Sequence, residues 1–191
     1  AEGYLARLIK AGHRVAIAEQ TESPAEARKA RGSKALVERA IIRLVTPGTL
    51  TEESLLDSAA PNWLAAVARA GDEWGIAAAD ISTGRFELIS CGPGELQAEL
   101  ARLSPAETIA DGSVPGVRCT AGKGGFDSLA GERALKSRFA VPSLDGFGEL
   151  TRAELAAAGG LLAYLEATQK QATAFLAAPR RIARLQHMAI D

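Results

Sequence analysis

Three apolar runs that follow one another with only short turns between them constrain the fold of this chain most. Gly71-Asp72 separates the first two runs and Ser82-Thr83-Gly84 separates the last two, and both are turn sequences. Strands joined by such short connections pair antiparallel, so the sequence predicts a three-stranded meander. Trp63 and Trp74 lie on its first two strands and are candidates for its core. The predicted strands are residues 62–69, 73–81 and 85–90.

The segments after the meander alternate between helical and strand patterns. Leu96, Leu100 and Leu103 fall on one face of a predicted helix. A helix between two strands of one sheet is a crossover connection, which places parallel strands side by side. The order of elements predicts an α/β domain on a mixed sheet with flanking helices. The predicted elements are a helix over residues 93–103, strands over 107–110 and 117–120, and a helix over 129–140.

The first 57 residues form a separate pattern of two helices and two strands. Ser23-Pro24 is typical of a helix N-terminus, and Gly12 and Gly32 end the two helices. Pro47-Gly48 follows the second strand and predicts a type II turn, because proline suits the first central position and glycine the second. The predicted elements are helices over residues 2–11 and 24–31 and strands over 14–20 and 37–45.

A third, helical segment begins near residue 150. Thr151 and Glu154 have the spacing of a capping box. Gly159-Gly160 disfavours a helix by roughly 1–2 kcal/mol, so we expect another helix to come close at that point. Residues 180–191 are expected to be extended.

The composition excludes several classes of protein. The net charge is −1 and the isoelectric point about 6.2, which excludes the broad basic surface of an autonomous nucleic-acid-binding domain. No apolar run approaches the roughly 20 residues that span a bilayer, and no secretory signal is recognisable. Cys91 and Cys119 have no metal-binding spacing, so we expect free thiols in a reducing cytoplasm. The chain lacks an initial methionine, which indicates a fragment of a longer protein.

A junction motif and four shorter motifs occur in an order and at a spacing that one bacterial family shares. The junction motif, residues 37–56, follows the pattern VERxxxRxVTPGTLTxExLL. The shorter segments resemble YLxKLxxxGxxVAIxEQ at residues 4–20, DxSTGxF at 80–86, and all but the first position of RxxPxE at 103–107 and of LLxYLxxTQ at 162–169. Together these segments resemble the MutS family of DNA mismatch repair proteins.

The resemblance implies a division into three parts. Residues 1–52 would be the C-terminal part of a mismatch-recognition domain, present here as an α+β remnant. Residues 58–148 would be a connector domain with a ribonuclease-H-like fold, and residues 150–191 would begin the helical core and lever domain. The attachments of the connector, near residues 51–60 and 145–150, are expected to act as hinges.

The resemblance also implies a function. The family recognises mismatched double-stranded DNA as a MutS homodimer, recruits MutL, and binds and hydrolyses ATP with Mg²⁺ in a C-terminal domain. We expect a bacterial cytoplasmic, nucleoid-associated protein with no membrane partner. The family's phenylalanine wedge and P-loop have no counterpart in this chain, so we expect a non-enzymatic fragment with no catalytic, cofactor-binding or metal-binding residues. Gly122-Lys123-Gly124-Gly125 lacks the P-loop frame and is expected to be a flexible loop.

A local cluster of basic residues is the candidate contact with DNA. Lys34 and Arg39 are the candidate residues, because the family's recognition domain lies along the DNA backbone. Such phosphate contacts position a protein without reading sequence. A solvated charged surface is the alternative interpretation. The cluster is Arg28, Lys29, Arg31, Lys34, Arg39 and Arg43.

Asp80 raises one alternative function, a stand-alone metal-dependent nuclease of the ribonuclease-H-like class. Such a site needs several carboxylates that converge on metal ions, and Asp111 and Asp145 are available in predicted loops. A simpler role for Asp80 is to cap the turn before Ser82.

Overall fold

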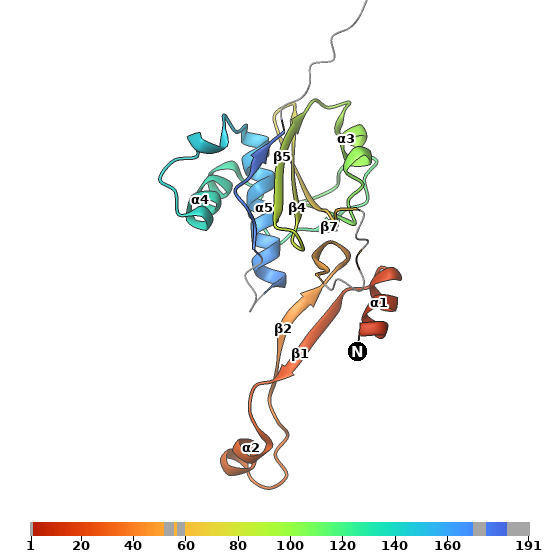
Figure 1. The fold of residues 1–191 in the computed structure, drawn as a ribbon, viewed down its shortest axis with the longest axis vertical. Helices are drawn as coiled ribbons and strands as arrows, with labels where there is room; N and C mark the ends of the chain where they lie inside the picture. The colour runs from red at the N-terminus through yellow and green to blue at the C-terminus, as the bar shows by residue number, and fades with distance from the viewer. Residues whose placement is uncertain (1, 52–55, 57–59, 170–174, 183–191) are drawn as a thin grey trace, which may run out of the picture.

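The chain folds into two units of unequal size, a slender hairpin unit and a larger α/β unit (Figure 1). This computed structural model describes residues 2–51, 56, 60–169 and 175–182. The hairpin unit projects from one end of the α/β unit and makes the molecule elongated (Figure 1). None of the helices in the described residues is long and apolar enough to cross a membrane.

A six-stranded mixed sheet forms the centre of the α/β unit. Its strands are β3 (Leu64–Ala70), β4 (Glu73–Asp80), β5 (Arg85–Cys91), β6 (Glu107–Ala110), β7 (Thr120–Ala121) and β8 (Arg180–Arg181). β4 runs antiparallel to β3 and to β5, which confirms the predicted meander. β6 lies parallel to β3, as expected for a crossover, and β7 and β8 extend the two edges. The order across the sheet is β7-β6-β3-β4-β5-β8.

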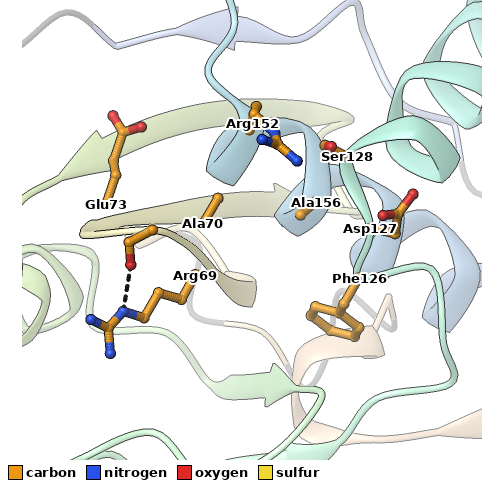
Figure 2. Close-up of a pocket in the computed structure, with 9 residues that line it drawn as sticks. Arg69, Ala70, Glu73, Phe126, Asp127, Ser128, Arg152 and Ala156 are labelled. Carbon is orange, nitrogen blue, oxygen red and sulfur yellow. Dashed lines mark hydrogen bonds between the residues drawn. The ribbon is translucent and has the colours of Figure 1, made fainter.

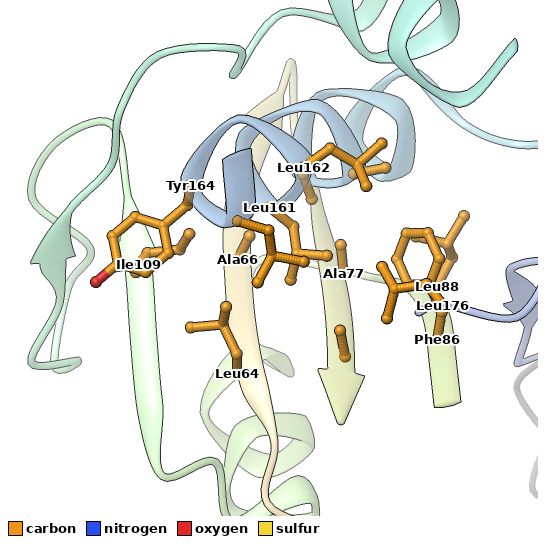
Figure 3. Close-up of a cluster of buried hydrophobic side chains, with 14 of the residues drawn as sticks. Leu64, Ala66, Ala77, Phe86, Leu88, Ile109, Leu161, Leu162, Tyr164 and Leu176 are labelled. Carbon is orange, nitrogen blue, oxygen red and sulfur yellow. The ribbon is translucent and has the colours of Figure 1, made fainter. Parts of the chain in front are cut away.

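Helices cover both faces of this sheet (Figure 1). α3 (Leu96–Leu103) packs its three leucines on one face. α4 (Ser128–Phe139) and α5 (Arg152–Thr168) lie on the other, where α5 contacts β3 and β4 directly and α4 packs against α5. Figure 3 shows Leu161 and Tyr164 of α5 beside Ala66 of β3 and Ile109 of β6. The mixed α/β architecture predicted from the sequence is therefore present.

The position of α5 differs from the expectation that a separate helical domain begins near residue 150. Thr151 and Glu154 do form the predicted capping box. The helix that follows, however, buries its apolar side chains in the core of the sheet. The Nε of Arg181, on β8, lies 3.0 Å from Glu154 Oε1 and ties the start of α5 to the sheet edge. α5 thus packs as part of the α/β unit. Of the extended segment expected over residues 180–191, the structure describes residues 180–182, and Arg180–Arg181 form β8.

Of the two expected hinge segments, the structure describes only residues 145–150 in full. Residues 145–150 connect α4 to α5 within one unit, so they do not separate two domains. The Phe147 ring packs edge-on against Phe139, with 5.6 Å between ring centroids. Most of the other expected hinge, residues 51–60, lies outside the described residues.

Glycines allow α4 and α5 to come into close contact. Gly131 of α4 faces Gly159 of α5, and a Cβ added to Gly159 would lie 2.8 Å from the Gly131 Cα. The Phe126 ring packs against Gly160 in the same region. This contact confirms the close helix approach predicted for Gly159-Gly160.

The hairpin unit consists of two antiparallel strands with a helix near each end. Its elements are α1 (Glu2–Lys10), β1 (Val15–Gln20), α2 (Pro24–Arg31) and β2 (Arg39–Val45). Ser23 caps α2, as predicted, and its Oγ accepts a hydrogen bond from the Glu26 N–H at 3.2 Å. A small core of Ile9, Val45 and Leu50 holds the end that lies near the sheet, and α2 lies at the far end (Figure 1).

The segment after β2 is not the type II turn that the sequence predicts. Residues Pro47–Thr49 form a short 3-10 helix, η1, and Gly48 lacks the positive φ that a type II turn requires. The cause is a pair of side-chain bonds. Thr49 Oγ1 accepts from the Thr46 N–H at 2.9 Å, and the two threonine hydroxyl oxygens lie 2.9 Å apart.

The two tryptophans of the meander differ in burial. Trp63 is 4% exposed, and the Arg85 guanidinium lies 4.8 Å from the centroid of its ring. Trp74 is half-buried near the β3–β4 turn, with the Arg69 guanidinium 5.7 Å from its ring centroid. Trp63 is therefore the core tryptophan, while Trp74 lies at the margin of the core.

We expect Gly131→Ala to lower the free energy of unfolding by about 1–3 kcal/mol, the usual cost of overpacking. The new Cβ would overlap the Leu155 carbonyl oxygen, so α4 would have to move away from α5. Urea unfolding followed by tryptophan fluorescence measures the change. Gly94→Ala is the matched control, because nothing lies within 4 Å of a Cβ at that position. Equal unfolding midpoints for the two variants would contradict a close contact between the helices.

Candidate nucleic-acid interface and the junction of the two units

Both predicted DNA-contact residues follow α2 in the sequence, and α2 lies at the far end of the hairpin unit (Figure 1). Lys34 is in the loop after α2, and Arg39 is the first residue of β2, in register with Gln20 of β1. Both residues are exposed. Arg28 and Lys29, in the last turn of α2, add positive charge at the same end. The structure thus gathers basic side chains where the molecule extends farthest from the sheet.

The other two members of the basic cluster have structural partners. Arg31 forms ion pairs with Glu22 and Glu38 across the hairpin end. Arg43 lies toward the other end of β2, where its Nη2 donates to the Thr49 carbonyl and the Thr51 hydroxyl, both at 2.9 Å. The cluster that appears continuous in the sequence is therefore divided between the two ends of the hairpin.

Glu22 braces the loop that carries Lys34. Its carboxylate accepts a hydrogen bond from the Glu38 backbone N–H at 2.7 Å and a second from the Arg31 guanidinium. The Glu38 N–H is the main cause that lowers the pKa of Glu22 below its usual value, and Arg31 adds to this effect. The Glu22 carboxylate thus joins the chain just before α2 to the chain just before β2.

Asp80 is buried at the end of β4, where it caps the turn to β5. Its Oδ1 accepts from the Ser82 N–H at 3.0 Å and from the Ser82 hydroxyl at 2.6 Å. These bonds account for its burial. Asp111 is exposed just after β6, and Asp145 begins another 3-10 helix, η3 (Asp145–Phe147). Within the residues that the structure describes, no three His, Cys, Asp or Glu side chains are grouped to hold a metal ion.

A cavity of about 400 Å³ lies between the β3–β4 turn and the first turns of α4 and α5 (Figure 2). Arg69 and Arg152 line it together with Glu73 and Asp127, so its positive and negative side chains balance. The Nε of Arg69 donates to the Gly71 carbonyl at 2.8 Å. Asp127 caps α4 by accepting from two backbone N–H groups of its first turn. A cavity with balanced charges and a capped helix does not fit the triphosphate of ATP.

The glycine-rich loop before α4 does not fit an ATP phosphate site either. The carbonyl of Gly125 packs against Gly159 of α5, and Gly122 lies against the Phe126 ring. Gly125 has a φ of +80°, which glycine adopts without strain. Gly125 thus allows close packing of the loop on α5, whereas a Cβ at Gly124 would have nothing within 4 Å.

A buried carboxylate joins the two units. Glu107, at the start of β6, is 8% exposed. Its Oε2 accepts from the Gly48 N–H of η1 at 3.2 Å, and its Oε1 accepts from the Tyr164 hydroxyl of α5 at 2.9 Å. Burial raises the pKa of Tyr164 well above its usual value, and the adjacent Glu107 carboxylate raises it further. Tyr164 therefore remains a hydrogen-bond donor at physiological pH.

The backbone of η1 lies directly against the α/β unit. A Cβ added to Gly48 would lie 2.9 Å from the Glu107 Cβ and from the Leu64 Cδ1, so only glycine fits without a shift. Asn62, just before β3, donates from its Nδ2 to the Pro47 carbonyl at 3.0 Å. Thr46 and Thr49 are fully buried on either side of this contact.

Reasoning from the sequence missed the role of Glu107 and Tyr164. Both residues belong to motifs that were recognised, RxxPxE and LLxYLxxTQ, but the motifs do not reveal that the two side chains meet. The available signal was a carboxylate that opens an otherwise apolar strand, because such a group must find donors once the strand is buried.

We expect the carboxyl group of Glu22 to titrate below its usual pKa, and to remain low in Arg31→Gln, because the Glu38 N–H is the larger cause. A lowered pKa in the folded state stabilises the hairpin end above the unfolded-state pKa, and this stabilisation disappears as the pH falls through the folded-state pKa. Carboxyl chemical shifts recorded by NMR against pH measure both proteins. A return of the Glu22 pKa to its usual value in Arg31→Gln would show that the ion pair, and not the backbone bond, holds the loop.

Comparison with known proteins assigns the chain to a family. A model described as MutS domain I matches residues 1–54, and one described as MutS domain II matches residues 62–177. The DNA mismatch repair protein MutS of Zymomonas mobilis subsp. mobilis is 58% identical over 202 residues, which cover 100% of this chain and 23% of that protein. The MutS proteins of Paracoccus denitrificans and Ruegeria sp. are 49% and 46% identical, with the same coverage. The chain spans about a quarter of the length of these relatives, and it belongs to the MutS family of DNA mismatch repair proteins.

Proposed function

We propose that this chain is the part of a MutS-type mismatch repair protein that connects a DNA-contacting domain to the rest of the protein. The observation that carries the proposal is the agreement between the family matches and the structure. The MutS domain I match covers the hairpin unit, and the MutS domain II match covers the described part of the α/β unit through residue 177. Mismatched double-stranded DNA is the ligand proposed for the longer protein.

The hairpin unit is proposed to contact the DNA backbone through Lys34 and Arg39. Both side chains are exposed beside Arg28 and Lys29, whereas Arg31 and Arg43 are held in bonds within the protein. Because the net charge of the whole chain is −1, the basic residues at this end form a local basic region and not part of a broad basic surface. Contacts of this kind add affinity and orientation but no sequence preference.

The α/β unit is proposed to be a connector domain with a ribonuclease-H-like fold. Three meander strands are followed by strands parallel to the first of them, in the order β7-β6-β3-β4-β5, which supports this fold. The packing of α5 on the sheet supports a connector that extends over residues 62–177 and not to residue 148. The bonds that Asp80 makes with Ser82 support a structural role for that carboxylate rather than the alternative nuclease.

The remaining proposals concern the longer protein. The connector would offer a surface to MutL, and the protein would act as a homodimer in the bacterial cytoplasm at the nucleoid. ATP and Mg²⁺ would bind in a domain outside this chain, because the cavity and the glycine-rich loop described above do not fit a nucleotide. The chain itself would then contribute positioning and partner contacts and no catalytic step.

We expect Lys34→Gln and Arg39→Gln to weaken DNA binding by the intact protein to a similar extent on matched and mismatched duplexes. Each lost phosphate contact should reduce the slope of log affinity against log salt concentration by about 0.9. Fluorescence anisotropy at several salt concentrations measures both quantities. Lys123→Gln is the matched control, because it removes one exposed positive charge from the loop before α4. An effect as large in the control would show that only the overall charge matters.

We expect the isolated 191-residue chain to bind DNA only in the non-specific range, with a dissociation constant of about 10⁻⁴–10⁻⁶ M at physiological salt. The reason is its net charge of −1 and the small size of its basic region. Anisotropy titrations with a G·T mismatch and with a matched duplex test this. A several-fold preference for the mismatch would mean that this chain contains the residues that sense mismatches.

A further inference from the structure

We propose that the Glu107 carboxylate locks the hairpin unit to the connector sheet, so that the two units move as one rigid body. A displacement of the hairpin would then reach β6 and α5 directly, through bonds across the junction. The rigid contact is inferred from the buried groups alone. Its use in passing on the position of DNA rests on the proposed function.

The lock is a single acceptor that is shared by two donors from different parts of the chain. An ionised glutamate carboxylate accepts hydrogen bonds and donates none. Gly48 supplies a backbone N–H from the hairpin side, and Tyr164 supplies a hydroxyl from α5. Because Glu107 itself lies in β6, one side chain connects η1, the sheet and the helix that packs on it. These donors are separated from Glu107 by 59 and 57 residues in the sequence.

Separation of the two units would break the bond between the Gly48 N–H and Glu107 Oε2 and would leave each group without this partner. Glu107 is 8% exposed, so water does not replace the lost bond unless the contact opens widely. Buried charged and polar groups are costly when they lack a hydrogen-bond partner. A small rotation of η1 away from Glu107 is therefore opposed more strongly than it would be at a solvated contact.

Shape complementarity adds to the lock. The Gly48 backbone sits against Leu64 and the Cβ of Glu107, and the bond from Asn62 to the Pro47 carbonyl fixes η1 from a second direction. Thr46 and Thr49 hold η1 itself in shape through their side-chain bonds. Each unit therefore presents a surface to the other that is held in shape by its own bonds.

Pulsed electron–electron double resonance, which measures the distance between two spin labels, tests the lock on the intact protein without DNA. Spin labels carried by p-acetylphenylalanine replace Ala16 on β1 and Ser137 on α4, two exposed positions on different units. Labelled protein is diluted with unlabelled protein, so that only distances within one chain are measured. We expect one narrow distance distribution in this parent protein. A broad distribution in the parent protein would overturn the proposal at once.

Glu107→Met is the variant that removes the lock, because methionine keeps a similar length and offers no carboxylate acceptor. We expect a broad distribution with a second, shifted maximum. Glu107→Gln should remain close to the parent protein, since its amide oxygen can accept from Gly48 and its NH₂ group can donate to the Tyr164 oxygen. Glu87→Met is the matched control: Glu87 is also buried, but it pairs with Arg85 on β5. It should leave the distribution narrow.

Two results with the methionine variants would also overturn the proposal. In the first, Glu107→Met gives a distribution as narrow as that of the parent protein. In the second, Glu87→Met broadens the distribution as much as Glu107→Met does. If Glu107→Met does not fold, as judged by its urea unfolding curve, Gly48→Ala decides the question, because its Cβ would lie 2.9 Å from the Glu107 Cβ and would push the η1 N–H away from the carboxylate. A broader distribution supports the lock, and an unchanged one refutes it. Failure of the DNA-binding proposal would appear in the Lys34 and Arg39 titrations and would leave these distances unchanged.

Discussion

The close contact between α5 and the sheet is the constraint on which the α/β unit is built. The facing surfaces contain many small residues, with alanines along β3, β4 and α5 between larger side chains such as Leu64 and Leu161. At Gly75 of β4, an added Cβ would overlap the Ala153 carbonyl at the start of the helix, and Gly131 and Gly159 allow α4 to pack equally close on the other side. Dispersion and burial both increase when elements approach this closely. Larger side chains at these positions would force the layers apart.

This close contact brings Glu154 and Tyr164 into the core, one near each end of α5, and both side chains have partners there. Glu154 is fully buried near the first turn, where it completes the capping box and pairs with Arg181 of β8. Tyr164 is fully buried near the last turn and donates to Glu107. Because buried polar groups require partners, each end of the helix specifies one neighbour. The first neighbour is the edge strand β8, and the second is the junction with the hairpin unit.

The distribution of charge separates the roles of the two units. The hairpin unit holds Arg31 in internal ion pairs and leaves Lys34 and Arg39 exposed at its far end. The α/β unit has a cavity whose charges balance, and its Asp80 carboxylate is used to cap a turn. This arrangement agrees with the proposed contact between the far end of the hairpin and a phosphate backbone. The proposed rigid junction would pass a displacement of that end on to the α/β unit.

The sequence alone determined those features that depend on neighbouring residues. The meander, the N-cap at Ser23, the capping box at Thr151 and the family resemblance all follow from short patterns, because turns and caps are local chemistry. The tertiary structure decided where α5 packs, that Pro47–Thr49 forms a 3-10 helix, and that Lys34 and Arg43 lie at opposite ends of the hairpin. It also brought Glu107, Gly48 and Tyr164 together. A buried carboxylate selects its donors by proximity in the folded chain, and separations of more than 50 residues in sequence carry no local signal of that choice.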